Sequence, residues 1–172
     1  MELFSTVFFV VILRGMEKIK TYTLNEAVRA LEHYCVYQDR CHQEVERKLS
    51  QMRLIPEIIE HTITHLIAEN FLNETRFSQS YARGKFRIKK WGKIRIVREL
   101  KSRNITEYNI KIALKEIDEE AYLTTLEELV TKKITATQET SLFKKKKKIV
   151  DSLLRQGYAY KDINEVLSKC LA

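Results

Sequence analysis

One spacing of apolar residues occurs three times along this chain. Each copy places apolar side chains at its first, fifth, tenth, fifteenth and nineteenth residue, and the copies begin 51 and then 53 residues apart. Self-similarity at a nearly fixed period indicates one repeated supersecondary unit, each copy too small to bury its apolar face alone. The fifteen positions are Val45, Leu49, Leu54, Ile59 and Ile63, then Ile96, Leu100, Ile105, Ile110 and Leu114, then Ile149, Leu153, Tyr158, Ile163 and Leu167.

The spacing within each copy is typical of amphipathic helices. Helices are expected over residues 41–52, 56–70, 93–103, 142–156 and 161–171. Four further helices are expected to begin at Thr23, Asn73, Thr106 and close to Glu119. The chain has one proline and four glycines, which is too little punctuation for a sheet with many tight turns. We therefore predict an all-α fold, a tandem array of three three-helix repeats that forms a curved, elongated stack.

A turn residue tests this division into helices. Directly before the third position of each copy stand Arg53, Asn104 and Gly157. A helix commonly ends in a residue of left-handed conformation, which glycine adopts freely and asparagine tolerates. Two of the three residues therefore suit the end of a helix, and Arg53 is the exception.

The chain is divided into four parts by these elements. They are an apolar N-terminal extension (residues 1–15) and three helical repeats over residues 16–72, 73–118 and 119–172. The apolar stretch within the extension is about eleven residues long, short of the roughly 20 that cross a bilayer, and lacks the basic start and small-residue cleavage site of a secretory signal. We expect Met16 to be the true start; a signal or anchor is the alternative. Three cysteines form no disulfide framework, which favours reduced thiols in the cytoplasm. Because the apolar stretch is too short to cross a bilayer, we also expect no membrane association.

Positive charge is concentrated in one part of the chain. The whole chain carries a net charge of +8, yet residues 81–105 alone hold ten basic residues and a single acid, Glu99. A basic balance points to nucleic acid, an anionic membrane or an acidic protein as partner. Because the segment is so local, we expect function to reside on the surface of the second repeat.

The second repeat contains an ordered set of residues: the runs at residues 71–77 (Phe-Leu-Asn-Glu-Thr-Arg-Phe) and 81–83 (Tyr-Ala-Arg), then Gly92, Ile96, Glu99-Leu100 and Arg103-Asn104-Ile105. The first repeat adds Glu44, Glu46 and Lys48-Leu49, and the third adds residues 154–158 (Leu-Arg-Gln-Gly-Tyr). In this order and spacing the residues resemble those of the RecX family of bacterial recombination regulators. Two departures are Asn104, where the family usually has glycine, and a run of five lysines at residues 144–148.

The resemblance implies a monomeric regulator without chemistry of its own. Such a protein binds the RecA recombinase filament on DNA, with non-sequence-specific contact to the DNA, and mostly inhibits its ATPase and strand exchange in DNA repair, recombination and the SOS response. A stand-alone helical DNA-binding or transcription-regulatory module is the alternative, although no helix directs Arg, Asn and Gln side chains at one groove. A scaffold for another acidic protein is a third reading.

The candidate binding residues are eight cations of the second repeat, which can neutralise phosphates or meet acidic side chains. Tyr81, Phe86 and Trp91 lie among them and could stack on bases, but their helical spacing favours packing in the core. The five-lysine run is interpreted as a solvated helix surface. The eight candidates are Arg83, Lys85, Lys89, Lys90, Lys93, Arg95, Arg98 and Lys101.

No catalytic, cofactor or metal motif is found along the chain. It has no Gly-rich phosphate loop, no nucleophile elbow and no carboxylate pair distinct from surface acids. His61 and His65 stand four apart on one predicted helix, but no third ligand completes a metal set nearby. We therefore expect a protein that is not an enzyme and needs neither cofactor nor metal.

Overall fold

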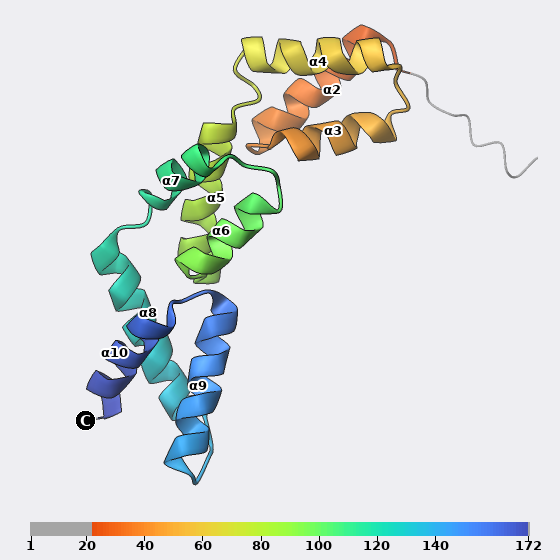
Figure 1. The fold of residues 1–172 in the computed structure, drawn as a ribbon. Coiled ribbons are helices and arrows are strands. Elements are labelled where there is room, and N and C mark those ends of the chain that lie inside the picture. The colour runs from red at the N-terminus through yellow and green to blue at the C-terminus, as the bar shows by residue number, and fades with distance from the viewer. Residues whose placement is uncertain (1–21, 172) are drawn as a thin grey trace, which may run out of the picture.

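The computed structural model describes residues 22–171, and helices are the only regular secondary structure in that part of the chain (Figure 1). The residues of the N-terminal extension (1–15) lie outside the described part. The predicted all-α class is confirmed, and the helix ends fall within about two residues of the expected ones. The helices are α2 (Leu24–Tyr37), α3 (His42–Gln51), α4 (Pro56–Ala68), α5 (Glu74–Lys89), α6 (Lys93–Lys101), α7 (Glu107–Leu114), α8 (Glu119–Ala136), α9 (Leu142–Gln156) and α10 (Tyr160–Leu171).

The helices form three successive three-helix units, as the fold prediction required. Unit one holds α2 to α4, unit two α5 to α7 and unit three α8 to α10, and in each unit the first helix packs mainly against the third. The units follow one another along a bowed path, from the upper right of Figure 1 to the lower left. The sequence limits drawn between the repeats stay a prediction.

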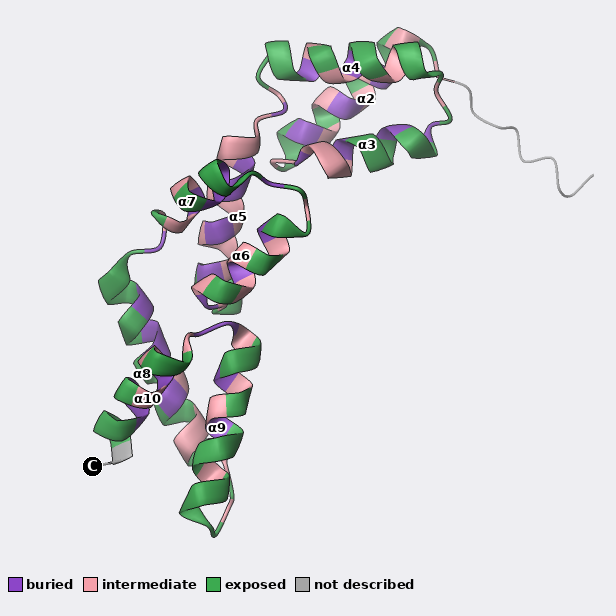
Figure 2. Ribbon diagram, in the orientation of Figure 1, coloured by how far each residue is buried: buried purple, intermediate pink, exposed green. Residues whose placement is uncertain are grey.

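The repeated apolar positions face the interior (Figure 2). None of the fifteen is exposed, and the equivalent residues Leu49, Leu100 and Leu153 are each completely buried. Units two and three share one continuous core, whereas unit one has a core of its own. Cys41 is the exception, since it belongs to unit one by sequence but is buried in the core of unit two. Units two and three are therefore expected to behave as one body, with unit one attached to it.

The turn before the third helix of each unit is left-handed in all three copies. Gly157 and Asn104 adopt φ angles of 93° and 59°, as expected, and Arg53 does the same at 53°. Arg53 is thus no exception in conformation, although a residue with a Cβ atom adopts this region at a cost. The packing of the repeat imposes this backbone conformation despite the local preference of Arg53, because the helices on either side are held by buried leucines.

Candidate partner-binding surface

The eight candidate cations lie on two consecutive helices of unit two and the turn between them. Arg83, Lys85 and Lys89 belong to α5, Lys90 ends that helix in a left-handed conformation, and the other four lie on α6. Asn73 begins α5 because its side-chain oxygen accepts a hydrogen bond from the backbone of Arg76 at 2.9 Å. The two helices position every candidate, but they direct them toward different neighbours.

Arg83 is engaged inside unit two. Its guanidinium donates to the Glu116 carboxylate at 2.8 Å, and Gln79 donates to the same carboxylate at 2.8 Å. The hydrogen bond from Arg83 lowers the pKa of Glu116. This pair ties the middle of α5 to the connection between α7 and α8, so Arg83 orders that connection.

Two more candidates flank the tryptophan. The guanidinium of Arg95 lies 4.0 Å from the centre of the Trp91 ring, and the ammonium of Lys85 lies 5.1 Å from it. Lys85 is also 5.0 Å from the Tyr81 ring, and cations over aromatic faces are held electrostatically. Tyr81, Phe86 and Trp91 are buried or half-buried, as the packing interpretation expected. Tyr81 and Trp91 therefore hold cations in place, whereas Phe86 stacks on the Tyr122 ring.

Lys93 lies in the joint between units two and three. It pairs with Glu119 at the start of α8, and its ammonium lies 4.7 Å from the centre of the Tyr122 ring. The backbone closes the same joint, because Gly92 N–H donates to the Gln156 carbonyl at 2.9 Å and Ile94 N–H to the Gly157 carbonyl at 3.0 Å. Unit three thus satisfies backbone donors at the start of α6 that the helix itself leaves unpaired.

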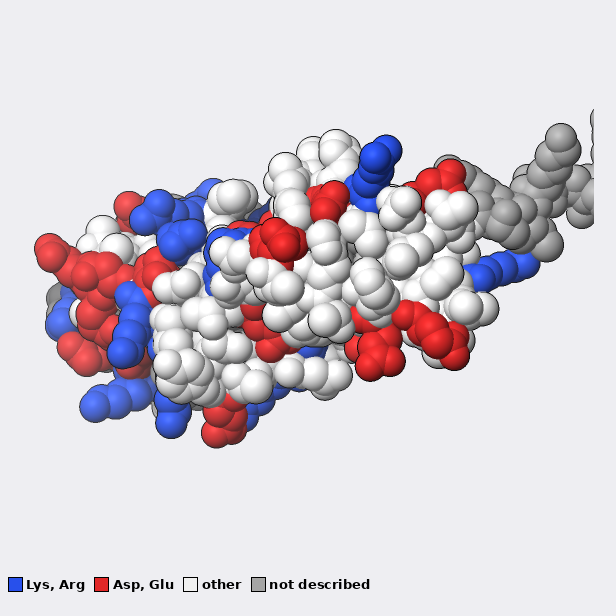
Figure 3. All heavy atoms as spheres, turned by 90° about the horizontal axis from the view of Figure 1, so that it is seen from above, with Lys and Arg blue, Asp and Glu red and all other residues white. Residues whose placement is uncertain are grey.

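The other four candidate cations are exposed to solvent. Lys89, Lys90 and Arg98 are exposed, and none of them forms an ion pair within residues 22–171. Lys101 contacts Glu107 at 3.1 Å, but both side chains are more than half exposed, so solvent screens this pair. Charge reversals of the three unpaired cations therefore break no ion pair within the described residues. Seen from above, the molecule is not uniformly basic, since acidic side chains lie among the basic ones (Figure 3).

A groove of about 380 Å³ lies beside these cations, where unit one meets α5. Lys85 and Lys89 line one side of it, and Asp39 and Glu44 of unit one line the other. Gly84 lies between them with no atom within 4 Å of where its Cβ would be, so the α5 backbone is bare there. A partner can approach the helix more closely at this point than elsewhere on α5.

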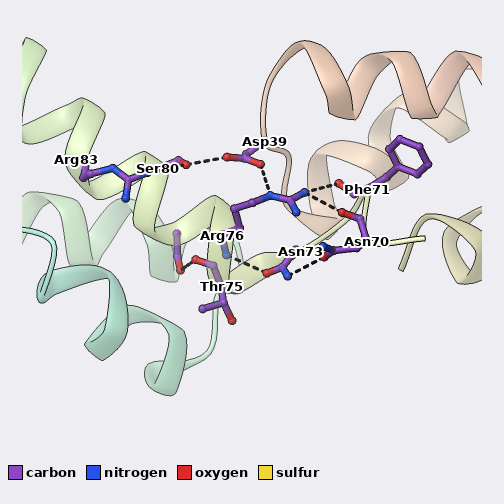
Figure 4. A network of polar contacts seen from close by, with 9 residues as sticks. Asp39, Asn70, Phe71, Asn73, Thr75, Arg76, Ser80 and Arg83 are labelled. Carbon is purple, nitrogen blue, oxygen red and sulfur yellow. Dashed lines mark hydrogen bonds and ion pairs between the residues drawn. The ribbon is translucent and has the colours of Figure 1, made fainter. Parts of the chain in front are cut away.

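Arg76 is a structural residue that the sequence analysis did not single out (Figure 4). Its Nε donates to Asp39 of unit one at 2.7 Å, and its Nη2 donates to the carbonyls of Asn70 and Phe71 at 3.0 and 3.1 Å. Ser80 donates to the second oxygen of Asp39 at 2.7 Å. The network fastens unit one to α5. Residues so far apart in the chain give no local signal, so only the packing brings them together.

Comparison with known proteins agrees with this architecture. The family model described as RecX, second three-helix domain, matches residues 73–114, and the model of the third three-helix domain matches residues 119–167. Together they cover more than half of the chain. The chain belongs to the RecX family.

Named relatives support the same assignment. The regulatory protein RecX of Bacillus cytotoxicus is 28% identical over 138 residues, covering 80% of this chain and 50% of that protein. Its counterpart in Clostridium acetobutylicum is 31% identical over 131 residues, covering 74% and 60%. This RecX-family chain therefore spans about half to three fifths of the length of these relatives.

Solved structures of the family share the fold. The crystal structure of RecX from Lactobacillus salivarius superimposes with a TM-score of 0.75 at 25% identity, covering 85% of this chain and 95% of that one. A second crystal structure, of a regulatory protein RecX, gives a TM-score of 0.75 at 19% identity over 83% of this chain and 72% of that one. The arrangement of three helical units is thus that of solved RecX proteins.

Within residues 22–171, no helix combines the length and apolar character needed to cross a bilayer. No group of three His, Cys, Asp or Glu side chains is placed there to hold a metal ion. His65, one of the paired histidines noted in the sequence, instead contacts Glu32 at 2.7 Å and links α4 to α2.

Proposed function

We propose that this protein binds the RecA recombinase filament on DNA and inhibits its ATPase and strand-exchange activities. The observation that carries the proposal is the membership of the RecX family joined to a bowed three-unit stack with unpaired cations on unit two. A filament repeats the same groove along its length, and an elongated protein can contact several protomers in it at once. The protein acts by binding, without chemistry of its own.

The contact is centred on Lys89, Lys90 and Arg98. These three are exposed and unpaired, so their charges are available to DNA phosphates or to acidic side chains of a filament. Lys101 adds to this surface through its largely solvated ammonium. Arg83, Lys85, Lys93 and Arg95 support the surface from behind, because each holds an aromatic ring or a carboxylate of the protein itself.

Inhibition follows from bridging. Units two and three share one core and unit one is fastened through Asp39 and Arg76, so the stack resists bending between its ends. When such a body spans neighbouring protomers, each protomer is held in its current position relative to the next. ATP hydrolysis and strand exchange both require those positions to change, so they slow together.

The decisive measurement is the DNA-dependent ATPase of RecA on single-stranded DNA, with this protein added in sub-stoichiometric amounts. Inhibition is expected, since one bridge restrains more than one protomer. An unchanged ATPase combined with tight binding to DNA alone contradicts the proposal. That result instead favours the alternative function, a stand-alone DNA-binding or transcription-regulatory module.

A charge-reversal variant locates the surface. Lys89→Glu, Lys90→Asp and Arg98→Glu together should abolish inhibition, and aspartate is used at position 90 because it tolerates the left-handed backbone there. If the cations contact single-stranded DNA, the negative slope of log affinity against log salt should become shallower by about 2 in the variant. Lys93 is left unchanged, because its reversal would place two carboxylates together at Glu119 and damage the joint.

A matched control carries the same total change of charge on unit one. Arg29→Glu, Arg47→Glu and Lys48→Glu alter three exposed residues. This control should inhibit RecA like the unaltered protein, and both variants should melt close to it. Retained inhibition by the unit-two variant, or equal loss in both variants, shows that the contact surface has been placed wrongly.

A further inference from the structure

Unit three carries an apolar groove that the proposed function does not use. It has a volume of about 390 Å³ and lies between α9 and α10. Phe143, Val150 and Leu154 of α9 line one wall, and Tyr160 of α10 lines the other. Phe143, Leu154 and Tyr160 are 77%, 41% and 60% exposed, although they are large and apolar. A gathering of exposed apolar side chains in one hollow indicates an interaction site.

The apolar wall is a second stripe on α9. The first stripe faces the core through Ile149 and Leu153, which are 1% and 0% exposed. Phe143, Val150 and Leu154 follow one another by seven and four residues, a spacing that keeps side chains on one side of a helix. Val150 is half-buried and also packs against the core, so only the two ends of the second stripe, Phe143 and Leu154, stay exposed. These exposed ends form the apolar part of the groove wall that the unit itself leaves uncovered.

The charge around the groove is mostly positive. Lys146 and Lys147, members of the five-lysine run, line its edge, and neither forms an ion pair within the described residues. Asp151 is the only acid among the lining residues. A ligand with apolar side chains along one face and carboxylates beside them would match both the wall and its rim.

We propose that this groove binds an acidic amphipathic helix of a partner protein. Two neighbouring helices leave a channel between them that a third helix fills by packing its ridges into the groove. The partner's apolar residues would lie against Phe143, Leu154 and Tyr160, and its carboxylates beside Lys146 and Lys147. A lipid bilayer fits less well, because the site is concave and contains the Asp151 carboxylate. Nucleic acid fits less well, because most of the lining is apolar.

The test uses a fluorescent peptide of about 18 residues, or five helical turns, with leucine at i, i+4, i+7 and i+11 and glutamate at most other positions. Its binding to the full chain is followed by fluorescence anisotropy. A scrambled peptide of the same composition and a peptide with lysine in place of glutamate are the controls. We expect the amphipathic acidic peptide to bind and both controls to bind at least about tenfold more weakly.

Variants on the groove make the result specific. Phe143→Ala with Leu154→Ala should weaken peptide binding by about tenfold or more, while the fold is kept because both side chains are exposed. Lys146→Gln with Lys147→Gln should weaken it by about fivefold at low salt and reduce its salt dependence. Lys115→Gln with Lys132→Gln, two exposed lysines of the connection after α7 and of α8, should change it by less than about twofold.

Four outcomes overturn the inference. They are a Kd weaker than about 1 mM for the amphipathic peptide, equal binding of the scrambled peptide, equal effects of the groove and control variants, and selective binding to anionic vesicles. If the chain self-associates and the Phe143→Ala, Leu154→Ala variant does not, the groove binds a second copy of this chain instead of a partner protein. Charge reversal at Lys89, Lys90 and Arg98 leaves this groove intact, so the two proposals fail independently.

Discussion

Lys93 pairs with Glu119 at the joint between units two and three, in the place where His42 contacts Glu74, at 3.1 Å, between units one and two. In both joints the first residue of a unit's second helix contacts the first residue of the next unit's first helix. The repeat therefore extends beyond the three-helix unit to the way units are joined. A carboxylate at a helix N-terminus is also favoured by the partial positive charge there.

The joint between units two and three should not tolerate a side chain at Gly92. A Cβ atom there would lie 2.2 Å from the carbonyl oxygen of Gly157 and 2.5 Å from the backbone nitrogen of Tyr158. Because both neighbours are backbone, relief requires the two units to separate. Gly92→Ala is expected to lower the free energy of unfolding by about 2 kcal/mol or more, measured by urea denaturation. Unchanged stability would show that the joint is looser than the backbone hydrogen bonds indicate.

Gly84→Ala should have the opposite effect. Gly84 lies inside α5, and a Cβ atom there would meet nothing within 4 Å. Glycine within a helix costs conformational entropy that alanine does not, so the substitution is expected to stabilise the protein by about 0.5 to 1 kcal/mol. The same urea titration measures it, and the pair of glycine variants controls for the general effect of adding a methyl group. Destabilisation would indicate a contact at this point of the groove.

Stability at acid pH should depend on Asp39. Burial raises the pKa of Asp39, but hydrogen bonds from Arg76 and Ser80 outweigh it and leave the pKa below its usual value. The folded state therefore gains stability from the charged carboxylate above the ordinary pKa near 3.8, and this gain is lost as pH falls through the lower folded value.

Asp39→Asn tests this dependence. It is expected to cost about 1 kcal/mol at pH 7, a modest value because Arg76 is 41% exposed and solvent screens the pair. The difference between the variant and the unaltered protein should shrink as pH falls below about 4, measured by urea denaturation at several pH values. A difference that stays constant with pH would mean that the Asp39 charge contributes nothing to the joint.

At alkaline pH the buried tyrosines should limit stability. Burial raises the pKa of Tyr158 to about 12, and burial with the Asp162 charge raises the pKa of Tyr122. A raised pKa means that the folded state favours the neutral phenol, so stability is intact below the ordinary pKa near 10 and falls as pH rises above it.

Tyr158→Phe separates the two effects of that hydroxyl. At pH 7 the variant should lose about 1 kcal/mol, because the hydroxyl donates to the Lys90 carbonyl at 3.2 Å. Between about pH 10 and 12 it should lose less further stability than the unaltered protein, since one buried phenol no longer ionises. Thermal unfolding followed by circular dichroism over this range measures both, and parallel pH curves would contradict the assignment.

Much of the fold could be predicted from the sequence, because its signals are local. Helix ends were placed by short-range pairs such as Thr23 with Glu26, whose capping box is present in the structure. Arg53 shows the limit of such reasoning: its type argued against a left-handed turn, yet the repeated packing on either side imposes one. The left-handed backbone costs a residue with a Cβ atom roughly 1 to 2 kcal/mol, whereas each of the several buried leucines around the turn contributes about 2.

The binding surface was less accessible to sequence reasoning. The basic segment was found by counting charges, but counting could not tell Arg83, which pairs with Glu116, from Arg98, which stays unpaired. The partners of Arg83 and Lys93 lie 33 and 26 residues away along the chain, and that of Arg76 lies 37 residues away. No spacing rule connects residues so far apart.

The sequence by itself determined the helices, their caps, the triplication and the basic character of unit two. These are encoded in the helical period of apolar side chains and in a sum of charges, neither of which needs the chain to be folded. Only the tertiary structure decided which cations pair with internal carboxylates or lie over aromatic rings. It also decided how Gly92 contacts Gly157 and where apolar side chains of α9 stay exposed. Those outcomes depend on distances between helices, within units and between them, which exist only after the helices have packed.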